Sequence, residues 1–442
     1  VFQPIDPKNV RIYACGPTVY DFIHIGNARP LVVFDVLVRL LRKIYPKVTY
    51  VRNITDIDDK INKRAIEKKI NISELTNETI KNFHKDAHAL GNLKPDFEPK
   101  ATDHISEMIE MIETLISNGF AYVSSGNVLF AVEKYNNYGA LSGRSLDEMI
   151  SGSRVEVAEY KKNPGDFILW KPSSEKLPGW DSPWGRGRPG WHIECSAMSK
   201  KYLGTQFDIH AGGLDLIFPH HENEIAQSCC ANKSDIMANY WLHNGYVTSD
   251  GEKMSKSLGN FATINNLLLN FRGEAIRYAL MQAQYRAPLS FSKKSLDEAT
   301  KSLSRLYRAV EGFEVNDGQD TQIIDNLCDD LNSPKALARL HYLADEANKG
   351  SKECAQKLKN SSNILGILCN STDEWFKFGE VNSNEAIENS AMTEKEIDEL
   401  IIKRKIAKEN KEYEKADQIR EQLLEKNIQL EDKPDRTVWR RL

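Results

Sequence analysis

Two short motifs, far apart in the sequence, contain residue types that bind a nucleoside triphosphate. One is the run His24, Ile25, Gly26 and Asn27 at the start of a predicted helix, and the other is the lysine-containing run 253–257. A helix start attracts phosphate through its backbone N–H groups and dipole. Lysines on a loop can neutralise a pyrophosphate leaving group. Although such short matches also arise by chance, their combination predicts nucleotidyl transfer.

A second group of residues could bind a metal ion. Cys15, Cys195, His220 and Glu224 offer sulfur, nitrogen and oxygen atoms of the kinds that suit zinc. His220 and Glu224 are four positions apart on a predicted helix and share a face, whereas His221 points to another face. The cysteines lie far from this helix in sequence. On spacing alone, ordinary buried cysteines and a capping or core histidine are therefore the simpler interpretation.

The surrounding sequence is typical of an α/β fold. Residues 10–14 and 48–54 are predicted strands, and residues 28–44 between them have helical spacing, which together make a βαβ unit of a parallel nucleotide-binding sheet. Strand-like runs return at 207–211 and 240–247, so the sheet resumes after an insertion. Strand signals vanish after residue 289, and helices are predicted at 301–311, 325–331, 335–348 and 354–368.

We therefore predict a Rossmann-like parallel-sheet domain split by an insertion, then an α-helical bundle and a small C-terminal domain. The predicted segments are 1–114 (first half of the sheet domain), 115–190 (connective insertion), 191–250 (second half, with the candidate metal ligands), 251–299 (Lys253 loop and stem-contact region), 300–378 (helical bundle), 379–392 (linker) and 393–442 (C-terminal domain).

Composition narrows the class of protein. The 442 residues are 40% hydrophobic and 28% charged, which excludes a disordered chain and a single small binding module. No apolar run is long enough to span a bilayer, so we expect a cytoplasmic protein without membrane contact. Seven scattered cysteines do not form a disulfide framework. The net charge of -4 argues weakly against nucleic acid but does not exclude a local basic face.

Longer strings make the sequence resemble one enzyme family. The runs 24–27 and 253–257 resemble the HIGH and KMSKS signatures of class I aminoacyl-tRNA synthetases, with Asn27 in place of the second histidine. The strings 15–21 (CGPTVYD), 50–60 (YVRNITDIDDK), 190–198 (GWHIECSAM), 218–228 (FPHHENEIAQS) and 329–338 (DDLNSPKALA) resemble the cysteinyl-tRNA synthetases in particular. The similarity extends through essentially the whole chain.

This resemblance implies a reaction and its participants. ATP, carrying Mg²⁺, activates L-cysteine as cysteinyl-adenylate, and the cysteine then passes to the 3′-terminal adenosine of tRNA(Cys). It implies catalytic roles for His24, Asn27, Lys253 and Lys256, and ATP contacts from these and from Gly26, Met254, Ser255 and Ser257. It also implies that one Zn²⁺ is bound by Cys15, Cys195, His220 and Glu224, and that Gly16, Thr55, Trp191 and Asp215 line the cysteine pocket.

Zinc suits the choice of cysteine over serine. A hydrophobic pocket separates near-isosteres by only about 1–3 kcal/mol. A zinc ion prefers a thiolate to an alcohol and lowers the pKa of the thiol that it binds. We therefore expect no editing domain in the chain. Histidines near the ligands, His192, His210 and His243, are candidates for nucleotide contacts.

The tail is locally basic. Lysines and Arg404 begin its first predicted helix, and Arg436, Trp439 and Arg440 combine cations with an aromatic ring that could stack on a base. A solvated helix with a frayed end is the simpler interpretation, but the resemblance implies anticodon binding by residues 393–442. Arg436 occupies a position where relatives commonly have glycine. We expect a monomer.

Two alternatives stay open from the sequence. One is a paralogous cysteine ligase that acts on a small amine acceptor, for which a basic C-terminal domain would be unnecessary. The other is a catalytically inactive RNA-binding or regulatory protein, against which the intact His24, Asn27, Lys253 and Lys256 argue.

Overall fold

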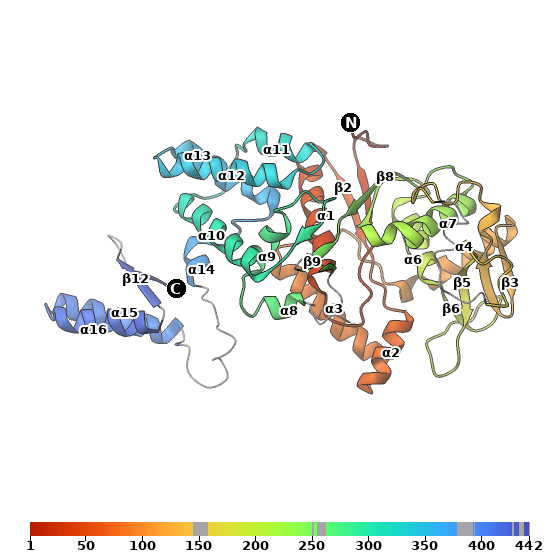
Figure 1. Cartoon of the computed structure of the whole chain (residues 1–442), viewed down its shortest axis with the longest axis horizontal. Coiled ribbons are helices and arrows are strands. Elements are labelled where there is room, and N and C mark those ends of the chain that lie inside the picture. Colours follow the sequence, from red (N-terminus) through yellow and green to blue (C-terminus); the bar gives the residue numbers. More distant parts are fainter. Residues whose placement is uncertain are drawn as a thin grey trace. The chain divides into compact units, whose positions relative to one another are not determined.

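The structure is a computed structural model that describes residues 1–144, 158–249, 252–253, 262–377, 392, 394–426, 428–432 and 437–441 (Figure 1). The chain forms two compact units. Unit 1 contains Val1–His88, Asn92–Thr248 and Tyr285–Leu289, and unit 2 contains Ala89–Gly91, Ser249–Gln284 and Ser290–Leu442. Among the helices described, none has the length and apolar character needed to cross a bilayer. The segment boundaries drawn from the sequence remain predictions.

The central sheet of unit 1 is parallel, as predicted. Its strands lie in the order β2-β1-β7-β8, and each neighbouring pair is parallel. Every residue of β2 is buried, which is typical of a parallel strand covered on both faces. The bounds are β1 Val10–Ala14, β2 Val48–Arg52, β7 Phe207–Gly213 and β8 Ala238–Asn244.

Helix α1, Ile25–Ile44, connects β1 to β2 and begins three residues earlier than predicted. The His24 carbonyl accepts the backbone N–H groups of Asn27 (2.8 Å) and Ala28 (3.0 Å), so the first turn already closes at the motif. Pro30 is tolerated near the helix start because the first turn's N–H groups have no partner within the helix. The motif therefore forms the N-terminus of the helix itself.

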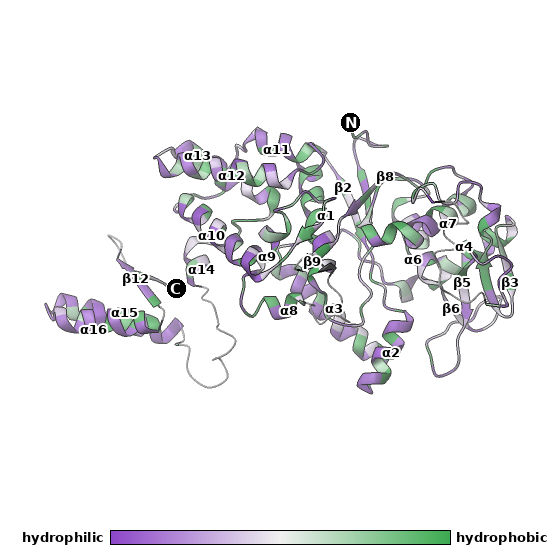
Figure 2. Ribbon diagram, in the orientation of Figure 1, coloured by the Kyte–Doolittle hydropathy of each residue, from purple (hydrophilic) through white to green (hydrophobic). Residues whose placement is uncertain are grey.

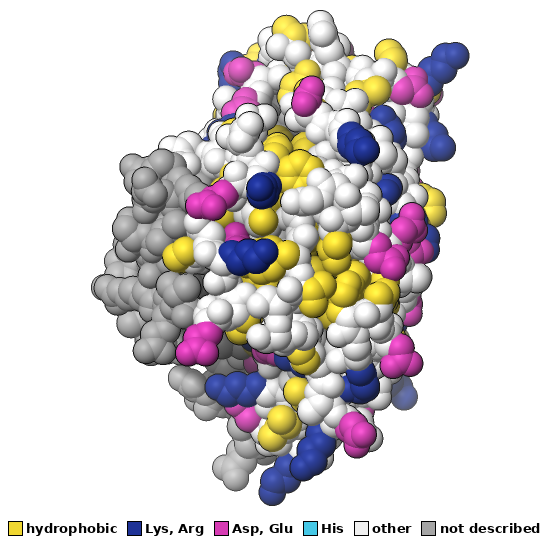
Figure 3. Space-filling model, turned by 90° about the vertical axis from the view of Figure 1, so that its right-hand side faces the viewer, with side chains coloured by type: hydrophobic (Ala, Val, Ile, Leu, Met, Phe, Trp, Pro, Cys, Tyr) yellow, Lys and Arg dark blue, Asp and Glu magenta, His cyan; other side chains and the backbone are white. Residues whose placement is uncertain are grey.

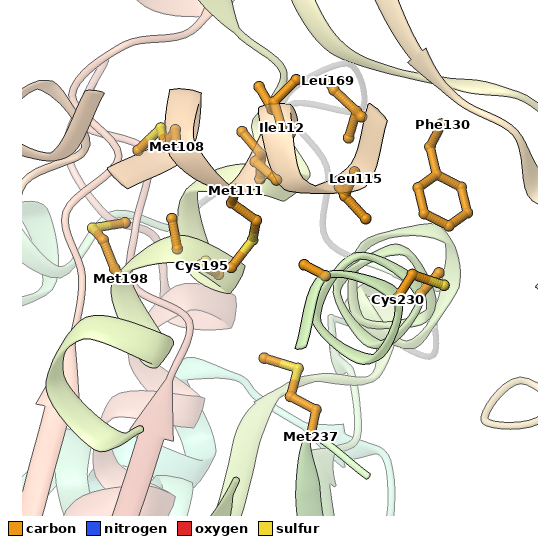
Figure 4. Close-up of a cluster of buried hydrophobic side chains, with 14 of the residues drawn as sticks. Met108, Met111, Ile112, Leu115, Phe130, Leu169, Cys195, Met198, Cys230 and Met237 are labelled. Carbon is orange, nitrogen blue, oxygen red and sulfur yellow. The ribbon is translucent and has the colours of Figure 1, made fainter. Parts of the chain in front are cut away.

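A second, antiparallel sheet lies within the predicted insertion, in the order β3-β4-β5-β6. Helix α4 packs against α6 and α7 over a core that includes Met111, Leu115, Cys195 and Cys230 (Figure 4). This core fixes the two helices that carry candidate metal ligands. The bounds are α4 Ile105–Ser117, β3 Ala121–Ser124, β4 Asn127–Phe130, β5 Phe167–Pro172, β6 Gly187–Pro189, α6 Trp191–Leu203 and α7 Glu222–Asn232.

Figure 3 shows how hydrophobic and charged side chains are distributed on one face of the molecule. Hydrophobic side chains gather near the middle of the face in Figure 3, and the basic and acidic side chains visible there are interspersed. The described part of this face therefore has no strongly basic area of the kind that binds a nucleic acid backbone.

The four helices predicted between residues 301 and 368 are present in unit 2, with shifted bounds. Helix α13 ends at Ser362 rather than at residue 368. The short helical turn Asn363–Leu365 follows it and ends at Gly366, whose left-handed φ of 63° stops further helix. The helices are α8 Ile264–Leu267, α9 Gly273–Leu280, α10 Lys293–Ala309, α11 Thr321–Cys328, α12 Ser333–Asn348, α13 Lys352–Ser362, α14 Thr372–Lys377, α15 Glu394–Glu409 and α16 Tyr413–Glu425.

The prediction that strands are absent after residue 289 is wrong. Strands β12 (Ile428–Asp432) and β13 (Thr437–Arg441) form an antiparallel pair. The apolar pattern of β12 is short. Ile428 and Leu430 are buried in a small core with Ile397 and Leu423, and the polar residues Gln429 and Glu431 alternate with them. Hydrophilic residues predominate along α15 and α16 (Figure 2), so this core is small.

The remaining elements complete the chain. They are α2 Asp59–Lys68, α3 Ile72–Ala89, the short strands β9 Val247–Ser249, β10 Glu252–Lys253 and β11 Leu289–Ser290, and the short helical turns Ala101–His104, Val132–Lys134, Leu214–Leu216, Ile217–His221 and Asn363–Leu365.

Candidate functional site

The candidate site lies at the carboxyl ends of the parallel strands, where ligands bind in open α/β sheets. Cys15 and Gly16 directly follow β1, and Thr55 follows β2 by three residues. Asp215 lies in the turn directly after β7. The three neighbouring strands β2, β1 and β7 thus bring together residues from separate motifs.

The four predicted metal ligands converge. The Sγ atoms of Cys15 and Cys195 are 3.7 Å apart, and the Oε1 atom of Glu224 lies 3.5 Å from Cys15 Sγ and 3.1 Å from His220 Nε2. The ligand atoms of all four residues lie within 4.8 Å of one another. Cys195, His220 and Glu224 are buried. The arrangement can hold a metal ion.

His221 also faces this cluster, which corrects the prediction that it points away. Its Nε2 atom lies 3.4 Å from Cys15 Sγ, and a second possible ligand set consists of Cys15, His210, His221 and Glu224. The prediction assumed helical geometry, but α7 begins only at Glu222, and the preceding turn Ile217–His221 contains a residue with non-helical backbone angles. Sequence spacing therefore gives the wrong direction for this side chain.

The other histidines contact the ligand residues. His210 Nε2 lies 2.8 Å from Glu224 Oε2, and His192 Nδ1 lies 2.9 Å from His220 Nδ1. His243 Nε2 lies 2.8 Å from His221 Nδ1. These contacts orient rings and carboxylate around the cluster, as outer partners of metal ligands commonly do. The nucleotide contacts suggested for these three histidines stay a prediction.

Burial sets the protonation of the cluster. It raises the pKa of the Cys195 thiol and raises that of Cys15 well above its ordinary value. It lowers the pKa of His220 and His221 well below the ordinary value, and that of His192 to about 4. Neutral imidazoles have a lone pair ready for a metal. Thiols give up their protons when a cation binds, so metal affinity depends on pH.

Three of the predicted pocket residues border the cluster. The Gly16 N–H donates to Asn53 Oδ1 (2.8 Å), and the Thr55 hydroxyl donates to Glu194 Oε2 (2.8 Å). Trp191, which is 38% exposed, stacks on the His220 ring with centroids 4.2 Å apart. The exposed indole beside a buried ligand places an open, partly apolar surface next to the cluster.

The first motif has a constrained geometry. A Cβ atom at Gly26 would lie 2.8 Å from Cε1 of the His24 ring, so a larger residue would displace that ring. The Asn27 side-chain oxygen accepts the His24 backbone N–H at 3.4 Å. Arg29, fully buried, donates to the carbonyl oxygens of Gly245 and Tyr246, both at 2.9 Å. The motif helix is therefore tied to the chain that leads into β9.

Comparison with known proteins places the chain in a family. Residues 1–301 match the model described as the tRNA synthetases class I (C) catalytic domain, and residues 322–370 match the DALR domain. The chain is 51% identical, over 100% of its length, to a cysteine–tRNA ligase of Rhodospirillum rubrum, covering 97% of it. It is 53% identical, again over 100% of its length, to one of Gluconobacter oxydans, covering 95%. The chain belongs to the cysteine–tRNA ligase family.

A solved structure agrees on the fold of this cysteine–tRNA ligase family member. Methionyl-tRNA synthetase of Mycobacterium tuberculosis, in complex with methionyl-adenylate, aligns with a TM-score of 0.57 and 14% identity over 81% of this chain and 89% of that one. The predicted family and the α/β class I fold with a helical region are thus confirmed.

Some residues predicted from the family resemblance cannot be placed in the site. Lys253 ends β10, but its side chain, like the run Met254, Ser255, Lys256 and Ser257, lies outside the described residues. Arg436 also lies outside them, and only the backbone of Arg440 is described, within β13.

Trp439 and Arg404 differ from the expectation of a solvent-facing basic tail. Trp439 is 4% exposed in the small core, and its indole N–H donates to Asp398 Oδ1 at 3.0 Å. Arg404 is 3% exposed and makes two hydrogen bonds, 2.8 and 2.9 Å, to the carboxylate of Asp432. Both side chains serve the packing of this region.

Sequence reasoning missed several buried polar residues of this cysteine–tRNA ligase family member. Asn53, Glu194 and Arg29 were given no role, although each is buried and contacts a motif. For Asn53 a signal was available, because a polar residue directly after an apolar strand of a parallel sheet lies at the ligand-binding edge.

Proposed function

We propose that the protein activates L-cysteine with ATP as cysteinyl-adenylate, releases pyrophosphate, and transfers the cysteine to the 3′-terminal adenosine of tRNA(Cys). The main support is the cluster of Cys15, Cys195, His220 and Glu224 at the carboxyl ends of the parallel strands, in a chain whose relatives are named cysteine–tRNA ligase. The attacking carboxylate of cysteine is already ionised at neutral pH, so the activation step needs positioning and charge neutralisation more than a general base.

The residues of the cluster fit zinc. Tetrahedral zinc with Zn–S bonds of about 2.3 Å separates two sulfur ligands by about 3.8 Å, and the two Sγ atoms here are 3.7 Å apart. Cys15, Cys195, His220 and Glu224 would hold one Zn²⁺, which when bound would favour the substrate's thiolate over a serine hydroxyl. His210 holds the Glu224 carboxylate, which leaves Oε1 facing the other ligands.

We assign the pocket and the nucleotide contacts as follows. Trp191 presents its exposed ring beside His220, and Gly16, Thr55 and Asp215 line the cysteine pocket around the strand ends. The N-terminus of α1 binds the phosphates of Mg²⁺-ATP through its N–H groups. The residues that act on ATP are His24, Gly26, Asn27, Lys253, Met254, Ser255, Lys256 and Ser257.

Contacts with tRNA(Cys) are proposed for the C-terminal region. We assign them to Arg436 and Arg440, while Trp439 supports the strand that carries Arg440, because its ring is buried in the core. We further propose that the protein acts as a cytoplasmic monomer.

A pair of cysteine variants tests the proposal. We expect the wild type to bind about one zinc per chain and to catalyse ATP–pyrophosphate exchange with cysteine but not with serine. Cys195→Ala should lose the zinc and the exchange together. Cys230→Ala is the matched control, since Cys230 is also buried in unit 1 but belongs to neither ligand set.

The outcomes separate the alternatives. Normal zinc content and exchange in Cys195→Ala would refute the ligand assignment. Exchange with cysteine but no charging of tRNA(Cys) would favour the cysteine ligase with a small amine acceptor. Absence of any cysteine-dependent exchange in the zinc-loaded wild type would refute the enzymatic proposal.

A further inference from the structure

Asn53 stands where three parts of the site meet. It is fully buried, directly after β2. Its Oδ1 atom accepts the Gly16 N–H at 2.8 Å and lies 3.7 Å from Cys195 Sγ, and its Nδ2 group donates to the Thr55 hydroxyl at 3.3 Å. One amide thus contacts two residues of the proposed pocket and one candidate metal ligand.

The backbone segments around the Asn53 side chain are closely packed and joined by a hydrogen bond. A Cβ atom at Gly16 would lie 1.6 Å from the carbonyl oxygen of Asn53, so these two backbone segments are in close contact. The Thr55 N–H donates to the Pro17 carbonyl at 3.1 Å, which joins the loop after β1 to the loop after β2. The third segment, helix α6 with Cys195, is reached from these loops by the Asn53 side chain.

Thr55 extends the connection. Its hydroxyl donates to Glu194 Oε2 at 2.8 Å, and Glu194 is the residue before Cys195 on α6. The path from Gly16 through Asn53 and Thr55 therefore returns to the same turn of α6 that carries the metal ligand. Of these hydrogen bonds, the two made by Thr55 are buried, and buried hydrogen-bond networks favour a single geometry.

We propose that Asn53 is a positioning residue that holds the metal ligands and the cysteine pocket in one arrangement. This inference rests on the proposed function and adds a residue to which no role has been given. An asparagine is suited to the place because its amide has both an acceptor and donors and has no charge. A leucine of similar size offers neither, and an aspartate would add a buried negative charge beside Cys195.

The test compares Asn53→Leu with Asn62→Leu in the full-length protein. Asn62 is a matched control, since it is a buried asparagine of unit 1 whose amide atoms have no hydrogen-bond partner among the described residues. Zinc affinity is measured by competition with a chromophoric chelator. The KM values for cysteine and for ATP are measured separately by pyrophosphate exchange.

We expect Asn53→Leu to weaken zinc binding and to raise the KM for cysteine, each by about tenfold or more, as loss of an outer partner of a metal site commonly does. The KM for ATP should change by less than about twofold, because the contacts of Asn53 are with the pocket and the cluster. Asn62→Leu should leave all three values close to those of the wild type.

Two results would overturn the inference. In one, Asn53→Leu keeps the zinc affinity and the KM for cysteine of the wild type. In the other, the KM values for ATP and cysteine rise together, as a merely structural defect would cause. If Asn53→Leu does not fold, Asn53→Ser is measured against Asn62→Ser with the same criteria.

The experiment distinguishes failure of the proposed function from failure of the role of Asn53. A wild type without cysteine-dependent exchange refutes the proposed reaction, and chelator competition then still decides whether Asn53 positions the metal ligands. A wild type that exchanges normally, beside an Asn53→Leu variant that behaves identically, refutes only the role of Asn53.

Discussion

Asp86 is a buried carboxylate whose removal should stabilise the protein. It lies on α3, is fully buried, and both of its oxygens lack a hydrogen-bond partner among the described residues. Burial raises the pKa of Asp86 to about 6 from an ordinary 3.8, partly opposed by the nearby Lys85. The folded state therefore disfavours the charged form of this residue.

The size of the effect follows from the pKa. The difference between about 6 and 3.8, at about 1.4 kcal/mol for each pH unit, amounts to about 3 kcal/mol of unfolding free energy lost at neutral pH. As the pH falls through about 6, the native state takes up a proton before the unfolded state does, so the loss shrinks. Below the ordinary pKa of 3.8 it is absent.

Asp86→Asn removes the charge and conserves the volume. We expect the variant to gain up to about 3 kcal/mol at a pH of about 7.5 and clearly less at a pH of about 4.5. The assay is urea denaturation of variant and wild type at both pH values. Glu78→Gln, on an exposed position of the same helix, is the control and should change stability little at either pH.

Two results would refute this reasoning. If the free energies of unfolding of Asp86→Asn and the wild type differ by the same amount at both pH values, burial does not raise the pKa of Asp86. If the variant is less stable near neutral pH, the carboxylate has a favourable interaction that its surroundings do not reveal.

Three further predictions concern unit 2. Tyr307→Phe should lower the free energy of unfolding by about 1–3 kcal/mol, measured in urea, because the Tyr307 hydroxyl donates to the buried Glu274 carboxylate at 2.6 Å. Gly273→Ala should lower the melting temperature measured by calorimetry, since the new Cβ would lie 1.8 Å from a backbone carbonyl oxygen; an unchanged melting temperature would contradict the packing. Arg404 lowers the pKa of Asp432, so the stability that this pair gives the C-terminal hairpin should be present above the ordinary aspartate pKa and lost as pH falls below it. Arg404→Gln should reduce this acid sensitivity in NMR spectra of the β12 and β13 pair, although Lys408 still contacts Asp432. Equal sensitivity in both proteins would refute the role of Arg404.

The elements predicted correctly are those with a strong local signal. Residues 10–14 form β1 as predicted, because an apolar run of that length ends at a Cys-Gly-Pro break. The β12 and β13 pair was missed because each strand has few apolar residues and is stabilised by packing against Ile397 and Leu423. Tertiary contacts of this kind leave little trace in a local window.

For the candidate site, what spacing predicts differs clearly from what the family resemblance predicts. Spacing alone could not favour a metal cluster, since Cys15 and Cys195 are 180 positions apart and meet only when the sheet and α6 are assembled. The resemblance to a known family supplied the four ligands, and the structure brings them together. Neither source could give the direction of His221, which depends on the irregular turn before α7.

The separation of the ligands has a consequence for synthesis of the protein. The candidate ligands Cys15 and Glu224 are 209 positions apart, so about half of the chain must leave the ribosome before the two side chains can meet. Zinc fingers, by contrast, close their sites within a few tens of residues and can fold around the metal early. Here a translation product that stops before residue 224 lacks a complete ligand set. Metal uptake would therefore distinguish chains that have completed the sheet from those that have not.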